Sequence, residues 1–432
     1  MKHVRIFATL LALLVISVTP AVIHSEDVYR EVTASGAHNL TLAVDNPRNL
    51  GGADDAALAR DVAEVLRFDM TLAGPFSVMA PPAGTSPGGI RPGEFDLDSW
   101  RNAGVDLLVK SGYTITGDSV TMEFRLYNAT QGRELAAKRY TGKRSDLRRI
   151  THTFSDDIMQ TMTGERGPFT GKIAFVSTES GNKEIYLMDY DGHNVQRLTK
   201  NRSINLNPDF SPNGRELAYT SYRRGNPDLF RREIFTGTEA VVSSHRGINV
   251  TGTWSPDGKQ LALAMSRDGN SEIYAISRDG RDPRRLTTHQ AIDVSPAWSP
   301  DGKRIAFVSD RLGKPQVFIM NADGSDVRRL TTSGAYNVSP RWSPKGDRLV
   351  YCRQEGGFQI YSIATDGTGD TRLTSEGSNE HPRWSPDGRF LTFSSTRDGG
   401  EAIYVMRSDG SGQTRVYRSK GKASHPTWSP RW

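Results

Sequence analysis

The chain has 432 residues, 36% of them hydrophobic, and a formal net charge of +6. It is longer than one ordinary domain, and its hydrophobic content is low for one large core. The basic residues are scattered and form no stripe interleaved with aromatics, so nucleic-acid binding is excluded as a main function. The single cysteine, Cys352, leaves no disulfide within the chain, and its place in a predicted strand favours a buried thiol over a nucleophile.

The N-terminus has the pattern of a secretory signal peptide. Lys2 and Arg5 precede an apolar run over residues 6–18, which is too short for a stable membrane span. We therefore assign residues 1–25 to a cleaved leader, with an uncleaved anchor as the alternative. Residues 26–38 have mixed polarity and predict a flexible arm. The mature protein is expected to be soluble and exported, without direct membrane insertion.

Residues 39–163 predict a small α/β domain. Apolar residues recur at helical spacing in two segments, and alternating or β-branched runs mark the strands. Helices are predicted at 54–72 and 145–162, a short helix around Trp100, and strands at 39–45, 76–80, 105–116, 119–128 and 134–141. A Pro/Gly-rich loop covers 81–92, and residues 164–170 form the hinge to the next domain.

From residue 170 to the end the chain is built from one repeat. The motif W-S-P-D-G and its variants place an aromatic residue at positions 210, 254, 298, 342, 384 and 428. The steps of 42 or 44 residues indicate a propeller or a stacked array. Around Trp298, strands are predicted at 293–298, 304–309, 316–321 and 327–331, separated by turns that contain Asp-Gly. Four strands per repeat match one propeller blade.

The first and last repeat units are each incomplete, and together they supply the strands of one blade. Three strands within residues 172–199 lack a W-S-P strand before them, and the last W-S-P copy has no strands after it. Pairing of residues 425–429 beside 173–177 would complete one blade and remove the free sheet edges. The predicted fold is a six-bladed β-propeller, residues 170–432, that follows the α/β domain. We expect each repeated tryptophan to be buried where blades meet.

Motifs for catalysis or metal binding are weak. Residues 84–88 spell G-x-S-x-G, but prolines precede and a glycine follows, whereas a hydrolase nucleophile needs a strand before it and a helix after it. His381 and His425 both lie three residues before a repeated tryptophan, so repeat geometry explains them better than a zinc site does. We predict no enzyme activity, no cofactor and no metal.

One ring of residues marks a candidate binding surface at the start of the innermost strands. Five positions before each repeated aromatic lie Asn205, Asn249, Asp293, Asn337, Asn379 and Ala423; six positions before it lie Ile204, Ile248, Ile292, Tyr336, Ser378 and Lys422. Two interpretations stay open. The amides cap turns, or apolar and polar side chains together form a mouth that binds a protein partner.

The leader, the α/β domain and the repeat W-S-P-D-G…I-A-F-x-S…I-Y-x-M…D-G…R-L-T together resemble the TolB family of the Tol–Pal system. Propellers of prolyl-oligopeptidase-type peptidases use similar repeats. The segment W-R-N-A-G-V-D-L-L-V at 100–109 and the helix before G-K-I-A-F at 171–175 make the resemblance more specific. It covers almost all of the mature chain.

The resemblance implies a monomeric, non-enzymatic periplasmic adaptor that supports outer-membrane integrity and constriction at cell division. It implies that the lipoprotein Pal binds at the propeller mouth and that TolA binds the N-terminal arm, with other envelope proteins as further candidate partners. The implied Pal site comprises Asn205, Ile248, Asn249, Ile292, Asp293, Tyr336, Asn337, Asn379 and His381. The implied TolA site comprises Asp27, Val28, Tyr29, Arg30 and Val32, although Arg30 and Glu31 interrupt the more apolar start of the family.

The alternative is a propeller enzyme, or a peptidase-accessory propeller, that acts on exported peptides or glycans. A peptidase of the prolyl-oligopeptidase type would need a hydrolase domain, and the predicted elements include none. Turnover assays with peptide and glycan panels would separate the two classes of protein.

Overall fold

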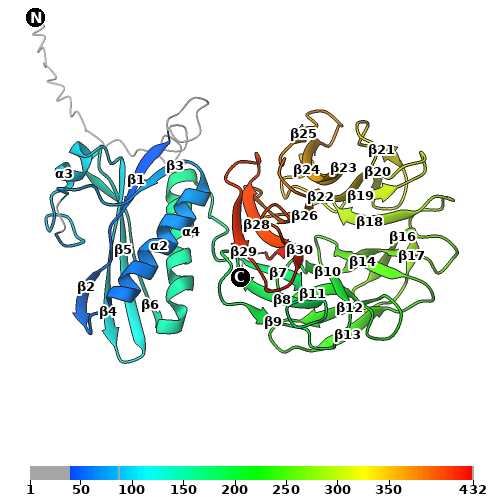
Figure 1. The fold of residues 1–432 in the computed structure, drawn as a ribbon, viewed down its shortest axis with the longest axis horizontal. Coiled ribbons are helices and arrows are strands. Elements are labelled where there is room, and N and C mark those ends of the chain that lie inside the picture. The colour runs from blue at the N-terminus through cyan, green and yellow to red at the C-terminus, as the bar shows by residue number, and fades with distance from the viewer. Residues whose placement is uncertain (1–38, 86–87, 431–432) are drawn as a thin grey trace, which may run out of the picture.

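The structure is a computed structural model that describes residues 39–85 and 88–430. The predicted leader at 1–25 and the arm at 26–38 lie outside the described residues. Figure 1 shows an α/β domain beside a propeller, joined by the segment that follows helix α4.

The α/β domain contains one six-stranded sheet. Its strands are β1 (Leu40–Val44), β2 (Arg48–Gly52), β3 (Phe76–Met79), β4 (Leu107–Thr116), β5 (Ser119–Asn128) and β6 (Arg133–Lys143). The order is β3-β1-β4-β5-β6, with β2 paired to β4 beyond the end of β1. The helices are α2 (Ala56–Ala73), α3 (Leu97–Asn102) and α4 (Leu147–Thr163), the last preceded by a 3₁₀ turn at Arg144–Asp146. Helices α2 and α4 lie on the side of the sheet that faces the propeller (Figure 1).

Helix α2 illustrates how local sequence sets an element. Asp55 caps its start, because the Asp55 carboxylate accepts a hydrogen bond from the backbone N–H of Leu58 at 2.9 Å. Leu58, Val62 and Leu66 recur every four residues and are buried against the sheet. The helix ends at Gly74, whose φ of 102° few other residues adopt.

Strand β2 is the element that the sequence does not predict, because its two glycines are typical of a loop. The strand approaches β4 so closely that a Cβ atom on Gly52 would lie 2.0 Å from the carbonyl oxygen of Ile115. Only glycine fits there, so a residue pair that indicates a turn in the sequence belongs to a strand in the fold.

The propeller has six four-stranded sheets. The first blade holds β7 (Lys172–Ser177), β8 (Glu184–Asp189) and β9 (Gln196–Arg197); the second β10 (Asn205–Phe210), β11 (Glu216–Ser221), β12 (Asp228–Glu233) and β13 (Glu239–Ser243); the third β14 (Asn249–Trp254), β15 (Gln260–Met265), β16 (Glu272–Ser277) and β17 (Arg284–Arg285). The fourth holds β18 (Asp293–Trp298), β19 (Arg304–Ser309), β20 (Gln316–Asn321) and β21 (Arg328–Arg329); the fifth β22 (Asn337–Trp342), β23 (Arg348–Glu355), β24 (Gly357–Ala364) and β25 (Thr371–Arg372); the sixth β26 (Asn379–Trp384), β27 (Phe390–Ser395), β28 (Ala402–Arg407) and β29 (Thr414–Tyr417).

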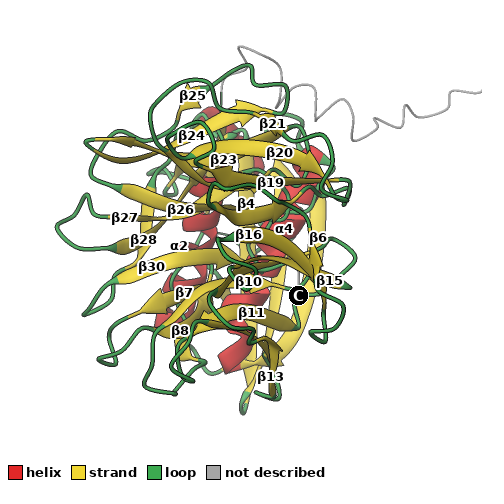
Figure 2. Cartoon of the chain, turned by 90° about the vertical axis from the view of Figure 1, so that its right-hand side faces the viewer, coloured by secondary structure: helices red, strands yellow, loops and turns green. Residues whose placement is uncertain are grey.

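The last strand, β30 (Ala423–Trp428), closes the ring by pairing antiparallel with β7. Ala423 lies opposite Ser177, and Trp428 lies opposite Ile173. In Figure 2, β30 is seen next to β7, although more than 240 residues separate them along the chain. The six-bladed propeller and its closure by the C-terminal W-S-P strand are therefore confirmed.

The repeated tryptophans lie between blades, as predicted, with one exception. Trp254, Trp342, Trp384 and Trp428 are buried, whereas Trp298 is only half-buried. The indole N–H groups of Trp254, Trp342 and Trp384 each donate to a backbone carbonyl of the preceding blade, at 3.0–3.2 Å. Uniform burial was thus a wrong expectation at Trp298, where the equivalent bond is not made.

The two domains share one hydrophobic core. Phe169, in the connecting segment, packs against Phe390 and Tyr190 of the propeller, and Tyr190 stacks on Trp428. Phe154 of α4 belongs to the same cluster of buried side chains. The α/β domain therefore packs on the ring as a continuation of its core.

Candidate protein-binding surface

The antiparallel blades give the ring two unlike faces. The first, innermost strand of each blade begins at one face of the ring. That face also carries the loops between the second and third strands of each blade, and we call it the mouth face. The W-S-P-D-G turns and the turns between third and fourth strands lie at the other end, the turn face. Within the described residues, the α/β domain packs on the turn face at the first and sixth blades only: Arg148 of α4 pairs with Asp191 in the turn between β8 and β9, and Glu165 pairs with Arg389 before β27. The mouth face is on the opposite side of the ring.

The predicted polar ring lies beneath the mouth face. The side chains of Asn205, Asn249, Asp293, Asn337 and Asn379 have an exposed fraction of 0%. Asn337 illustrates their role: its Nδ2 donates to Gln316 Oε1 at 2.7 Å and to the Ser333 carbonyl at 2.8 Å. The amide thereby ties the start of an inner strand to the preceding blade. The geometry fits the turn-capping interpretation, and a mouth in which these amides meet a partner directly does not fit this burial.

In three blades, an arginine at or just after the end of the second strand binds the buried Asn or Asp side chain of the polar ring. Arg353 donates to Asn337 Oδ1 at 3.1 Å, and Arg397 donates to Asn379 Oδ1 at 2.9 Å. In the same position Arg311 pairs with Asp293 at 2.9 Å. Burial raises the pKa of Asp293, and the guanidinium of Arg311 opposes this shift. These contacts hold the loops of the mouth face in one arrangement.

The apolar neighbours of the polar ring do reach the surface. The side chains of Ile204, Ile292 and Tyr336 are exposed, Ile292 to 50%, and Ile248 is half-buried. A one-residue offset explains the contrast, because successive side chains at the start of a strand point in opposite directions. The mouth face therefore displays the apolar members of the predicted site and hides most of its polar members.

Two further exposed residues were missed by the sequence reasoning. Tyr222 (37% exposed) and Leu312 (59% exposed) lie in the loops between the second and third strands of their blades. These loops are on the mouth face, as are the loops that hold Ile204 and Ile292. The backbone N–H of Tyr222 donates to the carbonyl of Ile204 at 2.9 Å, which fixes the two loops side by side. The available signal was an apolar residue inside a polar turn, as in Asp310-Arg-Leu-Gly313.

His381 lies in the channel, stacked on His425 with ring centroids 3.7 Å apart. Burial lowers the pKa of His381 to about 4, with a further contribution from Lys183. Burial and the neighbouring His381 lower the pKa of His425 as well. Both rings are neutral at neutral pH. Across the described ranges 39–85 and 88–430, no group of three or more His, Cys, Asp or Glu side chains is placed to hold a metal ion.

Three other features of the sequence are the single cysteine, the G-x-S-x-G segment and the N-terminal arm. Cys352 is buried, and burial raises the pKa of its thiol. Ser86 of the G-x-S-x-G segment lies outside the described residues; β3 ends at Met79 and α3 begins at Leu97, so the segment does not join a strand directly to a helix. The arm residues Asp27, Val28, Tyr29, Arg30 and Val32 also lie outside the described residues.

Comparison with known proteins agrees with this architecture. The family model described as the TolB beta propeller domain matches residues 159–432, and that of the TolB amino-terminal domain matches residues 29–135. The Tol-Pal system protein TolB of Geobacter metallireducens is 77% identical over 98% of this chain and 99% of its own length. This chain belongs to the TolB family of Tol–Pal system proteins.

More distant TolB proteins show how far the similarity extends. The Tol-Pal system protein TolB of Syntrophotalea carbinolica is 44% identical over 49% of this chain and 49% of its own length. The crystal structure of TolB from Acinetobacter baumannii has a TM-score of 0.80 at 24% identity, covering 90% of this chain and 96% of that one, which shows a shared fold. Among the described residues of this TolB family member, none of the helices is both long and apolar enough to cross a membrane.

Proposed function

We propose that this TolB family member is a periplasmic adaptor without catalytic activity, which binds the lipoprotein Pal at its mouth face and TolA through residues 26–38. The observation that supports the Pal site is the cluster of exposed apolar side chains on loops around one axis. These are Ile204, Tyr222, Ile292, Leu312 and Tyr336. Exposed apolar clusters rimmed by polar residues are typical of protein-binding surfaces.

The buried polar ring contributes to this role indirectly. Asn337 and Asn379 each make several hydrogen bonds that hold the loops before a partner arrives. A surface that is already ordered loses less conformational entropy on binding. The exposed apolar residues provide contact area, and the buried amides keep the loops in position.

A double substitution of exposed residues tests the Pal site. Ile292→Asp with Tyr336→Asp places two charges where apolar contacts are proposed, and affinity for the periplasmic domain of Pal should fall about 100-fold or more. Thermal stability should change little, because both side chains are exposed. Phe235→Asp is the matched control, since Phe235 is 62% exposed on the turn face. Undiminished Pal binding by the folded double variant would place the site elsewhere.

The TolA site is tested separately. Deleting residues 26–38 should abolish binding of TolA in a pull-down and leave Pal affinity unchanged. In cells, loss of either interaction should weaken the outer membrane and delay constriction at division. Turnover of exported peptides or glycans by the purified protein would contradict the proposal of a non-enzymatic adaptor.

A further inference from the structure

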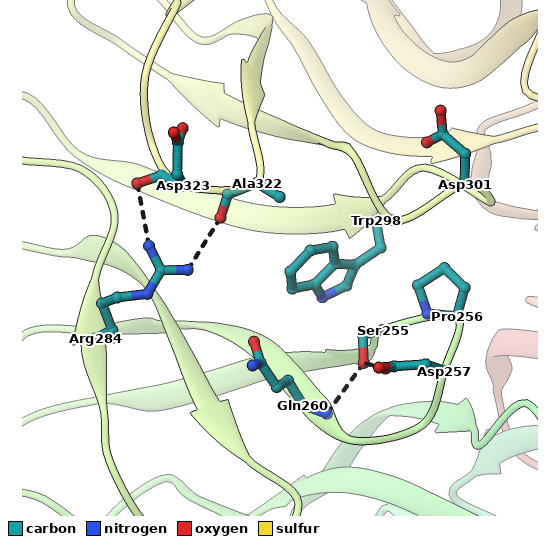
Figure 3. Close-up of a pocket in the computed structure, with 10 residues that line it drawn as sticks. Ser255, Pro256, Asp257, Gln260, Arg284, Trp298, Asp301, Ala322 and Asp323 are labelled. Atoms are coloured by element: carbon teal, nitrogen blue, oxygen red, sulfur yellow. Dashed lines mark hydrogen bonds between the residues drawn. The ribbon is translucent and has the colours of Figure 1, made fainter.

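The turn face carries a pocket of about 500 Å³, on the side of the ring opposite the mouth face. It lies between the blade of β14–β17 and the blade of β18–β21. Figure 3 shows Trp298 in the centre, with Gln260 and Arg284 along one side and Pro256 on the other. Most ligand pockets in proteins measure about 300–1,000 Å³. The size suits a small flat ligand, and nothing in the proposed adaptor role uses this site.

Trp298 differs from its repeat equivalents in a way that packing does not explain. It is half-buried, and its indole N–H has no hydrogen-bond partner among the described residues, whereas Trp254 and Trp342 each donate to a carbonyl. An unpartnered buried donor costs about 1–3 kcal/mol. The repeat thus retains a tryptophan at a place where it makes neither the usual hydrogen bond nor the usual close packing.

Trp428 is another repeated tryptophan that lacks this hydrogen bond, and it shows that a second aromatic ring can stack on such an indole. The indole N–H of Trp428 also lacks a partner among the described residues, and Tyr190 stacks on its ring with an interplanar angle of 16°. There the chain itself covers the tryptophan. Trp298 instead borders the pocket, so a flat group from another molecule can pack against its ring.

The polar groups around Trp298 determine which class of ligand the pocket can bind. One oxygen of Asp257 and one of Asp301 accept hydrogen bonds from the serines of their own turns, which lowers the pKa of both carboxyl groups and keeps them anionic. The guanidinium of Arg284 is engaged by the carbonyls of Ala322 and Asp323, at 3.1 Å each. Three aspartates (Asp257, Asp301 and Asp323) and one guanidinium line the pocket, so its net negative charge disfavours an anionic ligand, and the Asp257 carboxylate offers acceptors to hydroxyl groups.

Gln260 adds a group that can both donate and accept. Its side-chain amide makes no hydrogen bond within the part of the chain that the structure describes, and it lies along the pocket beside Trp298 (Figure 3). The Gln260 amide, the Asp257 carboxylate and one aromatic ring match a pyranose, which has an apolar face of C–H groups and a rim of hydroxyls. A proline-rich peptide would need a longer groove with several aromatic residues.

We propose that the Trp298 pocket on the turn face binds a neutral saccharide, with a pyranose ring stacked on the indole and its hydroxyls hydrogen-bonded to Asp257 and Gln260. The negatively charged acceptors disfavour uronic acids, phosphates and nucleotides. This site is independent of Pal and TolA binding, so either proposal can fail without the other.

Calorimetric titration of the full-length mature protein with cellotriose and chitotriose tests the site. Saturable binding is expected for at least one of these probes. Trp298→Ala should remove detectable binding, and Gln260→Ala should weaken it about tenfold, the scale of one net hydrogen bond. Trp254→Phe is the matched control in the equivalent groove one blade earlier and should leave the affinity unchanged. Should Trp298→Ala fail to fold, Trp298→Phe and Gln260→Ala provide the same comparison.

Three outcomes would overturn the proposal. Neither saccharide binds at several millimolar; saccharide binding survives in folded Trp298→Ala; or a proline-rich decapeptide binds in a Trp298-dependent manner and the saccharides do not. A shift of the Trp298 indole ¹⁵N–¹H resonance on saccharide addition, with the other indole resonances unmoved, would support it directly.

Discussion

At the scale of single residues, equivalent positions of the repeat have unequal energetic roles. Trp342 is 7% exposed and donates its indole N–H to the carbonyl of Ala297 at 3.0 Å. Trp342→Ala should lower the free energy of unfolding by about 3–5 kcal/mol, as large-to-small core changes do. Trp298→Ala should cost only about 1–2 kcal/mol, since the half-buried ring removes less area from water. Urea unfolding of both variants measures the difference, and equal losses would contradict it.

The buried amides give a second prediction at this scale. The Asn249 amide accepts from Ser243 Oγ at 2.6 Å and donates to the carbonyl of His245 at 2.7 Å. Asn249→Ala leaves these groups without partners and should cost about 2–3 kcal/mol of unfolding free energy. A thermal melt measures the loss, with the mouth-face variant Ile292→Ala as the control.

Should Asn249→Ala be as stable as the unsubstituted protein, the amide would have no structural role and direct contact with a partner would again be open. An arginine at position 249 would disrupt folding and binding together, because the native side chain is buried.

At the scale of elements, β30 determines whether the ring is closed. It pairs with β7 along its length, and Ser429 Oγ accepts a further hydrogen bond from the backbone N–H of Lys172 at 2.9 Å. Deleting residues 423–432 exposes the edge of β7 and uncovers the inner strands on either side. The melting temperature should fall far more than after an ordinary terminal trim, and the protein should associate through the open edge.

Light scattering coupled to size exclusion, together with calorimetry, measures both effects. A truncated protein that stays monomeric with an unchanged melting temperature would mean that closure contributes nothing to stability.

At the scale of the whole molecule, a buried charged cluster joins the α/β domain to the ring. His152 of α4 lies 2.8 Å from Asp69 of α2 and 3.1 Å from Asp191 of the propeller. Arg148 also pairs with Asp191. Burial alone would lower the pKa of His152, but the two carboxylates outweigh it and raise the pKa to about 10. The imidazolium is therefore the bridging form at neutral pH.

The sign of the pH dependence follows from this shift. An unfolded histidine titrates near pH 6.5, so the folded state binds the proton more tightly than the unfolded state. This stabilisation is fully present below about pH 6.5 and is lost as the pH rises toward about 10. His152→Gln should cost about 3–5 kcal/mol, the scale of breaking a buried pair, and should remove this decline.

Calorimetry between pH 6 and 10 measures both quantities. His193→Gln is the matched control, because His193 is exposed and lies 3.4 Å from the same Asp191. Parallel pH profiles for the unsubstituted protein and His152→Gln would exclude His152 as the titrating group.

The parts of this protein that depend on local pattern can be predicted from its residues alone. The 44-residue spacing, the Ser-Pro-Asp-Gly turns and the alternation within each unit predict four strands per blade, and the incomplete first and last units predict closure of the ring. Turn chemistry and strand alternation act over a few residues, so they can be read without knowing what packs against them. Helix α2 was predictable for the same reason, because its cap and its apolar stripe are local.

Which side chains reach the surface depends on packing between segments that are distant in the sequence. Asn249 and Ile292 both belong to the predicted site, yet Asn249 is buried and Ile292 is 50% exposed. Strand alternation points the two kinds of side chain in opposite directions, and the loops of neighbouring blades determine which direction is buried. Trp298 differs from Trp342 through contacts made by residues more than 40 positions away. The link between His152 and Asp191 joins two domains. Burial and charge pairing at these residues depend on partners that lie far apart along the chain, so no local pattern predicts them.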